Sequence, residues 1–274
     1  MISSAQSISS HDRTNDGGIR TPLRCRSLLG YEIAAAPSDE CAQAIAEWIH
    51  KQDRLRYFVC LNPHSIQTAT RDDEFRDAVA AADLILPDGV GVILASRMLG
   101  AGIESRVTGF DIFQYVSGLL QQRGGARYFF LGSDSRTLEA ITTQVGHLFP
   151  ALTVVGTYSP PFADDFTEGE SERMIEIVNR TEPDILWLGL SAPKQEKWLY
   201  RYRHQLSPPV AAPIGAVFDY FAGTKVRPGY VARRLGLEWL SRLVQEPRRL
   251  WSRTAISAPA FVGHVVMTKI RDRR

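Results

Sequence analysis

Apolar runs that suit β-strands alternate with stretches of helical pattern along most of this 274-residue chain. Strands that alternate with helices of about ten or more residues predict an α/β fold with a mainly parallel sheet and helices on both faces. The predicted strands are residues 56–62, 83–88, 126–133, 151–159, 184–191 and 209–220, and the predicted helices are residues 65–81, 90–99, 135–149, 168–180 and 193–205.

Polar residues stand where the predicted strands end. Asp88, Ser133, Ser191 and Asp219 lie at or near carboxyl ends of strands, which is where ligands bind in open α/β sheets. We therefore expect these residues to share one site. Asp88 is part of "LPDGVGV" (86–92), in which a proline ends an apolar run and two glycines follow. Because Pro-Asp-Gly is also good turn chemistry, a plain turn is the alternative.

Positive charge is concentrated towards the C-terminus. Residues 225–274 hold twelve Lys and Arg against three Asp and Glu, a net charge of +9, which leaves −7 for residues 1–224 because the whole chain carries +2. In residues 230–253, leucine and tryptophan recur every four residues, and arginines lie between them, which predicts an amphipathic helix. Pro247 is expected to kink or end this helix. Such a helix suits an anionic membrane interface, and a helix docked on the domain is the alternative. Residues 255–268 are too short and interrupted to cross a bilayer, which needs about 20 apolar residues.

The composition divides the chain into three segments. Residues 1–27 are predicted to be a disordered leader, since they lack the apolar core of a secretory signal. Residues 28–224 form the α/β domain, and residues 225–274 the basic appendage. Cys25, Cys41 and Cys60 are odd in number and show no C-x-x-C spacing, which favours a reducing compartment.

Several common site motifs are absent from the sequence. No G-x-G-x-x-G follows the first predicted strand, and no G-x-x-x-x-G-K-[ST] or H-E-x-x-H occurs. No D-x-D follows an apolar strand, and His and Cys do not cluster at ligand spacing. We therefore expect neither a metal nor a cofactor. Helix N-termini and arginines can hold a group with two phosphates without a metal.

Three residues are the strongest candidates for chemistry. Asp88 is a plausible general base, which would need its pKa raised by burial to work near neutral pH. Arg106, in "ESRVTGFD", stands in a loop-like stretch before a helix, and Gln195 follows the helix start in "SAPKQE". The less specific alternatives are a turn or cap for Asp88, a surface ion pair for Arg106 and an exposed first turn for Gln195.

Taken together, these stretches resemble the WecG/TagA/CpsF glycosyltransferases. The resemblance runs from about residue 28 to residue 253, with the motifs in the family's order, and is carried by "LNPHSIQTA", "ADLILPDGVGV", "SRVTGFD", "FFLGS", "ILWLGLSAPKQEKW", "GAVFDYFAGTKVRPGY" and "GLEWLSRLVQEPRRLWSR". It implies a Rossmann-like catalytic domain over residues 28–224 with a basic amphipathic helical appendage.

The resemblance also implies an activity. It is the inverting, metal-independent transfer of a sugar from UDP-N-acetylmannosamine or UDP-glucose to a polyprenyl-diphosphate-linked sugar, in cell-surface or exopolysaccharide biosynthesis. The protein is then expected to be peripheral on the cytoplasmic face of the membrane, with an anionic lipid surface and no nucleic acid as partner. The oligomeric state is left open.

The resemblance assigns roles to individual residues. Asp88 is expected to be the base, and Arg106 to stabilise the departing diphosphate. Gln195 is expected to contact donor or acceptor. The family often has threonine where this chain has Cys60, and a thiol is a poor substitute for a hydroxyl donor. The donor-binding candidates are Asn62, Ser133 and Asp219, and the acceptor and membrane candidates are Arg227, Arg233 and Arg234.

Two other functions remain as alternatives. A non-catalytic nucleotide-sugar-binding module docked on the membrane would bind UDP-sugars without releasing UDP. A dehydrogenase or epimerase on the same fold class would bind a nicotinamide, and the missing glycine fingerprint argues against it.

Overall fold

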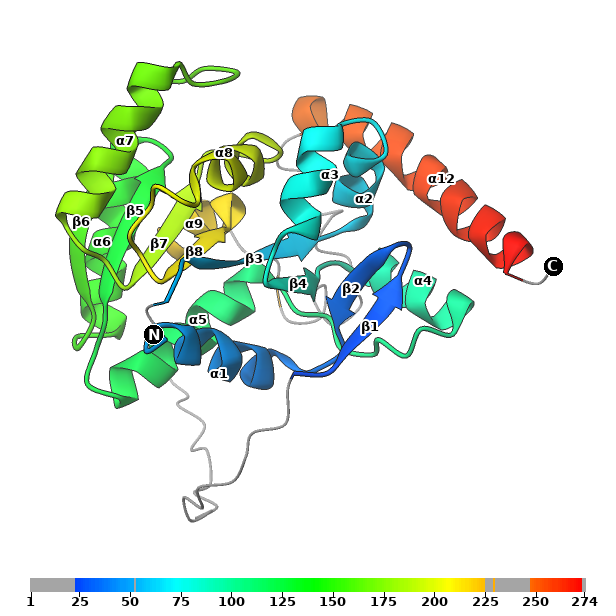
Figure 1. Cartoon of the computed structure of the whole chain (residues 1–274), viewed down its shortest axis with the longest axis horizontal. Coiled ribbons are helices and arrows are strands. Elements are labelled where there is room, and N and C mark those ends of the chain that lie inside the picture. Colours follow the sequence, from blue (N-terminus) through cyan, green and yellow to red (C-terminus); the bar gives the residue numbers. More distant parts are fainter. Residues whose placement is uncertain (1–22, 52, 225–228, 230–246, 273–274) are drawn as a thin grey trace, which may run out of the picture.

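One mixed β-sheet forms the centre of the molecule. The computed structural model describes residues 23–51, 53–224, 229 and 247–272. In this part of the chain eight strands follow the order β1-β2-β4-β3-β8-β7-β5-β6 (Figure 1). β1 pairs with β2 antiparallel, and every other pair of neighbours is parallel. The strands are β1 Cys25–Leu28, β2 Tyr31–Ala34, β3 Arg56–Leu61, β4 Leu84–Pro87, β5 Arg127–Gly132, β6 Thr153–Tyr158, β7 Ile185–Gly189 and β8 Val210–Pro213.

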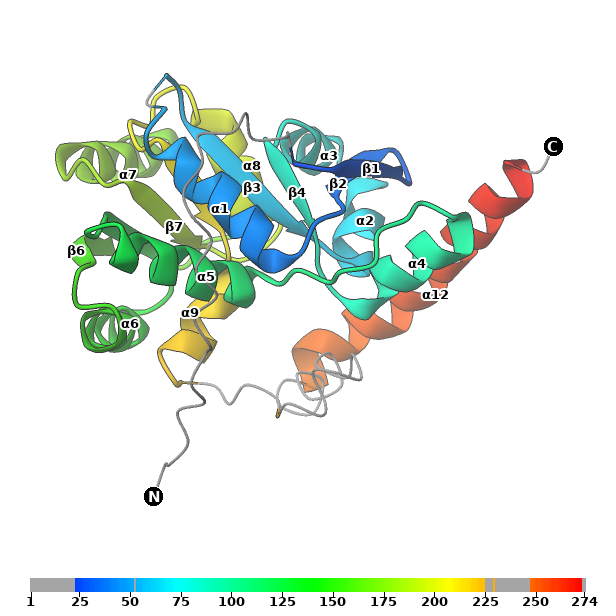
Figure 2. The same ribbon diagram turned by 90° about the horizontal axis from the view of Figure 1, so that it is seen from below.

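Helices cover both faces of this sheet, as the sequence predicts. α2, α3, α4, α7, α8 and α12 contribute to the core on one face, and α1, α5, α6 and α9 to the core on the other (Figures 1 and 2). The helices are α1 Ser38–Trp48, α2 Pro63–Ala69, α3 Asp73–Ala80, α4 Val90–Leu99, α5 Gly109–Gln122, α6 Ser135–Leu148, α7 Glu168–Arg180, α8 Lys194–Tyr202, α9 Gly215–Phe221 and α12 Pro247–Arg271.

The strands supply both cores because successive side chains point to opposite faces. In β7, Leu186 and Leu188 face the first core, and Ile185 and Trp187 face the second. Trp187 is fully buried, and its ring lies 5.0 Å from that of Phe113 between centroids. Continuous apolar runs are therefore what a sheet covered on both faces requires.

The sequence predicts two segments wrongly. The helix expected over residues 65–81 is two helices, because the Asp72 side chain accepts a hydrogen bond from the Phe75 N–H (2.9 Å) and starts α3. The strand expected over residues 209–220 ends at Pro213, and α9 follows. Val217 and Phe221 are buried four residues apart, a helical spacing that continues the apolar run without a break.

The C-terminal helix α12 packs against the body of the protein. Phe261 and Val265 are buried in the first core, and His64 Nδ1 lies 2.8 Å from Ser257 Oγ. Pro247 is the first residue of α12, where the missing N–H of proline costs nothing. Most of the helix expected over residues 230–253 lies outside the described residues, as do residues 1–22 of the predicted leader. Residues 25–27, also predicted to be disordered, belong instead to β1, where they pair with β2. Within the described residues, no helix is both long and apolar enough to cross a membrane.

Candidate active site

Two loops meet at the carboxyl edge of the sheet, after β3 and after β4. The Asp88 N–H donates to the Leu61 carbonyl (2.9 Å), which ties the start of one loop to the end of the neighbouring strand. A Cβ on Gly91 would lie 2.5 Å from Cγ of Pro63, so only glycine allows the loops to approach this closely. Asp88 is half-buried where they meet.

Arg106 comes to the same place from the segment that precedes α5. The N–H of the next residue, Val107, donates to the Pro87 carbonyl (2.9 Å). The backbone segment that carries Arg106 therefore runs beside the segment that carries Asp88. The Arg106 side chain is half-buried. Thr108 then caps α5 by accepting from the Asp111 N–H (3.2 Å).

The three donor-binding candidates occupy different positions along this edge. Asn62 caps α2, because its Oδ1 accepts from the Ser65 N–H (3.0 Å). Ser133 has a positive φ of 65° and donates its N–H to the Gly189 carbonyl (3.0 Å), so it sits between β5 and β7. Asp219 lies within α9, not at the end of a strand as expected, and is half-buried.

Gln195 and Glu196 form a buried pair in the first turn of α8. Their side chains are 5% and 7% exposed, and Gln195 Nε2 donates to Glu196 Oε1 (2.9 Å). Burial raises the pKa of Glu196 to about 7, and the hydrogen bond from Gln195 opposes this rise. Gly215 packs on the pair, since a Cβ there would lie 3.0 Å from Gln195 Oε1.

Sequence reasoning singled out Gln195 and missed Glu196. The buried residues of α8 are Gln195, Glu196, Trp198 and Leu199. Because positions three and four apart share a helix face, Glu196 is on the same stripe as the apolar Leu199. A carboxylate on an apolar stripe was the signal that could have identified it.

Cys60, near the end of β3, packs against the start of α5. Its Sγ would be 3.3 Å from a Cβ on Gly109, at the start of α5. Burial raises the pKa of the Cys60 thiol well above its usual range, and the nearby charges of Asp88, Glu196 and Asp111 raise it further. The thiol is therefore neutral, and the structure brings Asp88 and Glu196 into one electrostatic environment.

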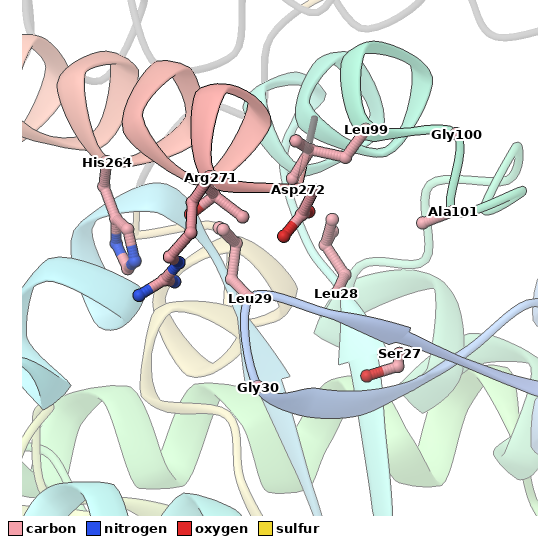
Figure 3. A pocket seen from close by; sticks show the side chains of 11 residues that line it. Ser27, Leu28, Leu29, Gly30, Leu99, Gly100, Ala101, His264, Arg271 and Asp272 are labelled. Carbon is pink, nitrogen blue, oxygen red and sulfur yellow. The ribbon is translucent and has the colours of Figure 1, made fainter. Parts of the chain in front are cut away.

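A groove of about 550 Å³ opens elsewhere on the molecule (Figure 3). It lies between the β1–β2 turn at Gly30, the end of α4 at Leu99 and the last turns of α12, where His264 and Arg271 line it. None of the predicted site residues that the structure describes lines this groove. Asp88 precedes the opposite end of α4, and ten helical residues span about 15 Å. The groove is thus separate from the candidate site.

Two further expectations concern the acceptor arginines and a metal site. Arg227, Arg233 and Arg234 lie outside the described residues. Among the residues described, no group of three His, Cys, Asp or Glu side chains could hold a metal ion.

Comparison with known proteins gives one family match over most of the chain. Residues 26–274 match the model of the "Glycosyl transferase WecG/TagA/CpsF family". An N-acetylglucosaminyldiphosphoundecaprenol N-acetyl-beta-D-mannosaminyltransferase of Bacillus subtilis is 30% identical over 73% of this chain and 75% of its own. The enzyme of the same name from Bacillus spizizenii is 30% identical over 78% and 80%. That from Staphylococcus aureus is 24% identical over 90% and 94%.

Proposed function

The chain belongs to the WecG/TagA/CpsF family of glycosyl transferases, and we propose that it transfers a sugar from a UDP-sugar to a polyprenyl-diphosphate-linked sugar. The observation that carries the proposal is the match over residues 26–274, together with relatives named for an N-acetylglucosaminyldiphosphoundecaprenol acceptor and an N-acetylmannosaminyl group. Those names favour N-acetylmannosamine over glucose as the transferred sugar, and N-acetylglucosamine as the sugar that accepts it.

Asp88 is the proposed general base. A hydroxyl oxygen of the acceptor attacks the anomeric carbon of the donor, the bond from that carbon to the UDP oxygen breaks, and the hydroxyl proton passes to the Asp88 carboxylate. Attack from the face opposite to UDP inverts the anomeric centre. A base must be held within reach of the proton that it removes, and the backbone bond from Asp88 to Leu61 supports this role.

Arg106 and Gln195 are the proposed partners of Asp88. The departing UDP carries negative charge on its diphosphate, and a guanidinium group stabilises such charge through charge-assisted hydrogen bonds. The backbone bond between Val107 and Pro87, which keeps Arg106 beside the Asp88 loop, supports this assignment. Gln195 offers a neutral polar contact to either sugar.

The remaining assignments follow the edge of the sheet. Asn62, Ser133 and Asp219 are proposed to bind the donor, and Arg227, Arg233 and Arg234 to contact the acceptor diphosphate. Since arginines neutralise the diphosphate in this scheme, transfer should proceed without a divalent metal. Activity that survives EDTA would agree with this, and activity restored only by a divalent ion would contradict it.

Release of UDP tests the activity. Purified protein is incubated with UDP-N-acetylmannosamine, UDP-N-acetylglucosamine or UDP-glucose and a short-chain lipid-diphosphate N-acetylglucosamine. We expect release with UDP-N-acetylmannosamine that depends on the lipid acceptor. Asp88→Asn should abolish transfer and retain UDP-sugar binding, whereas the matched variant Asp77→Asn, on the exposed side of α3, should keep full activity. Absence of lipid-dependent release with every donor would refute the proposal.

The outer side of α12 supports a peripheral position on the membrane. Its inner side is fixed by Phe261 and Val265, but its outer side exposes Val262 (57%), Met267 (66%) and Ile270 (48%) to solvent. An exposed apolar stripe on one helix favours an interaction surface. α4, which begins just after Asp88, packs on α12 and exposes Leu94 and Met98.

Charge favours a lipid surface as the partner of this stripe. Residues 225–274 carry a net charge of +9, and each basic residue near an anionic leaflet contributes about 1 kcal/mol. The acceptor of the proposed reaction stays in the bilayer, so an enzyme at the cytoplasmic face would meet it there.

Vesicle binding tests the membrane proposal. Because Phe261 and Val265 belong to the core, substitutions on the outer side are a sharper test than deletion of the helix. Met267→Glu should weaken binding to phosphatidylglycerol vesicles about tenfold or more, since burying one such side chain is worth about 1.5–3 kcal/mol. Leu148→Glu, on the equally exposed end of α6, is the matched control and should bind like wild type. Equal binding by both variants would contradict the role of α12.

A further inference from the structure

The Gln195–Glu196 pair leaves two buried oxygen atoms without a partner. Gln195 Nε2 donates to Glu196 Oε1 (2.9 Å), and among the described residues neither Gln195 Oε1 nor Glu196 Oε2 has a hydrogen-bond partner. Both side chains are more than nine-tenths buried. Buried acceptors without donors are costly and uncommon in folded proteins. Such an arrangement is expected where a ligand supplies the missing donors.

The contact with Glu196 fixes the orientation of the Gln195 carboxamide. Gln195 Nε2 donates to Glu196 Oε1, and this oxygen can accept whether or not Glu196 is protonated, so the NH₂ end of the amide faces the carboxyl group. The oxygen end then faces Gly215, where a Cβ would be only 3.0 Å away. Glycine at this position lets the backbone pass this close to the oxygen. Gln195 therefore presents an acceptor, not a donor, to anything bound there.

Glu196 and the proposed base share one neighbour, Cys60. Glu196 and Asp88 both act on the Cys60 thiol, as does Asp111 from α5. These groups come from β3, from the loop before α4, from α5 and from α8, and Arg106 is the charged group beside Asp88. The hydrogen bond to Gln195 is the direct contact that Glu196 makes with a candidate site residue.

We infer that Glu196 is a positioning residue, which holds the Gln195 carboxamide so that its oxygen accepts a hydrogen bond from a hydroxyl or amide N–H of the bound sugar. The inference rests on the proposed function. The hydrogen bond to the Gln195 oxygen makes the site selective for a sugar that carries a hydrogen-bond donor at this position. An analogue in which hydrogen or fluorine replaces that hydroxyl leaves the Gln195 oxygen unpaired and is rejected.

A double-mutant cycle separates this role from a merely structural one. We expect Gln195→Ala and Glu196→Ala each to lower kcat/KM for UDP release about tenfold, the loss expected for one hydrogen bond. If Glu196 acts through Gln195, the double variant is no worse than Gln195→Ala, because residues in one network are not additive. Glu196→Gln keeps an oxygen for Gln195 Nε2 and should recover most of the activity. Gln205→Ala and Glu172→Ala, at exposed positions, are the matched controls.

A second readout does not depend on turnover. The Gln195 side-chain amide is assigned in ¹H–¹⁵N spectra as the signal that is lost in Gln195→Ala. We expect this amide to be protected from hydrogen exchange in wild type and unprotected in Glu196→Ala. Additive losses in the cycle, or an unprotected amide in wild type, would overturn the positioning role. A wild-type protein that releases no UDP but protects this amide would instead refute the proposed function and leave the geometry of the pair established.

Discussion

Replacing Glu196 by glutamine should remove a pH dependence from the stability of the fold. Glu196 is buried, and burial raises its pKa from an ordinary 4.5 to about 7. Between these two pH values the folded protein keeps a proton on Glu196 that the unfolded chain has released. Stability therefore falls as pH rises from about 4.5 to about 7, and this contribution is constant above pH 7. Glutamine does not titrate, so the variant lacks this contribution.

The size of the effect follows from the distance between the two pKa values. Each pH unit between them is worth about 1.4 kcal/mol, so the wild type loses about 3 kcal/mol of unfolding free energy over the interval. Most domains have only about 5–15 kcal/mol in total. The difference in stability between Glu196→Gln and wild type should thus grow by about 3 kcal/mol from pH 4.5 to pH 8.

Urea unfolding followed by tryptophan fluorescence measures this difference, since Trp187 and Trp198 are buried and become exposed on unfolding. Unfolding free energies of wild type and Glu196→Gln are compared at pH 4.5, 6, 7 and 8. The matched control is Glu172→Gln, an exposed carboxylate on α7, for which we expect a difference from wild type that does not grow with pH. A Glu196→Gln protein with the same pH dependence as wild type would refute the reasoning and show that Glu196 is ionised in the folded state without penalty.

Three smaller predictions concern the loops, a surface network and a helix cap. Gly91→Ala should push Pro63 away from the Asp88 loop and lower both activity and melting temperature, whereas Gly118→Ala, which meets nothing within 4 Å on α5, should stabilise by about 1 kcal/mol. Arg201 holds the pKa of Glu74 down at about 2, so Glu74→Gln should cost at most about 1 kcal/mol of unfolding free energy at pH 7 for this partly exposed pair. That cost should disappear as pH falls from about 4.5 towards 2. Thr167→Ala, which breaks the capping box of α7, should cost about 1 kcal/mol without a change in kcat.

The central part of the sheet could be predicted because its strands β3, β4, β5, β7 and β8 are buried on both faces. Such strands are continuous apolar runs, and the polar or glycine residue after each run marks the carboxyl end. For this reason Asp88 and Ser133 were expected where the structure has them. The same rule fails at residues 209–220. The apolar residues on one side of α9 are also buried, and they follow the apolar residues of β8 directly. A break between two apolar elements is invisible when the connection is a single residue, Ile214.

The environment of each site residue could not be predicted in the same way. The adjacent letters of "PKQE" do not reveal that both Gln195 and Glu196 turn inward, because this depends on how α8 rotates against β7 and β8. The close approach of Gly215 to Gln195 joins residues twenty positions apart. Nor does the sequence indicate that Cys60 lies among three carboxylates. Burial and pairing are tertiary properties, and only the chemical types of the residues are local.

The carboxylates that act on Cys60 bear on how the basic appendage (residues 225–274) and the α/β domain are expected to act together. The charges of Asp88, Asp111 and Glu196 all act on Cys60, and residues 1–224 carry a net charge of −7. The proposed UDP donor would be repelled by such a site unless cations offset the carboxylates. Arg106, beside Asp88, is the proposed source of one such charge, and residues 225–274 carry a net charge of +9 in the sequence. A neutral Glu196 lessens the repulsion further, because a protonated carboxyl carries no charge to oppose the diphosphate. For the anionic donor proposed above, burial of Glu196 would favour binding below about pH 7, where the carboxyl is protonated, at a cost in fold stability above pH 4.5.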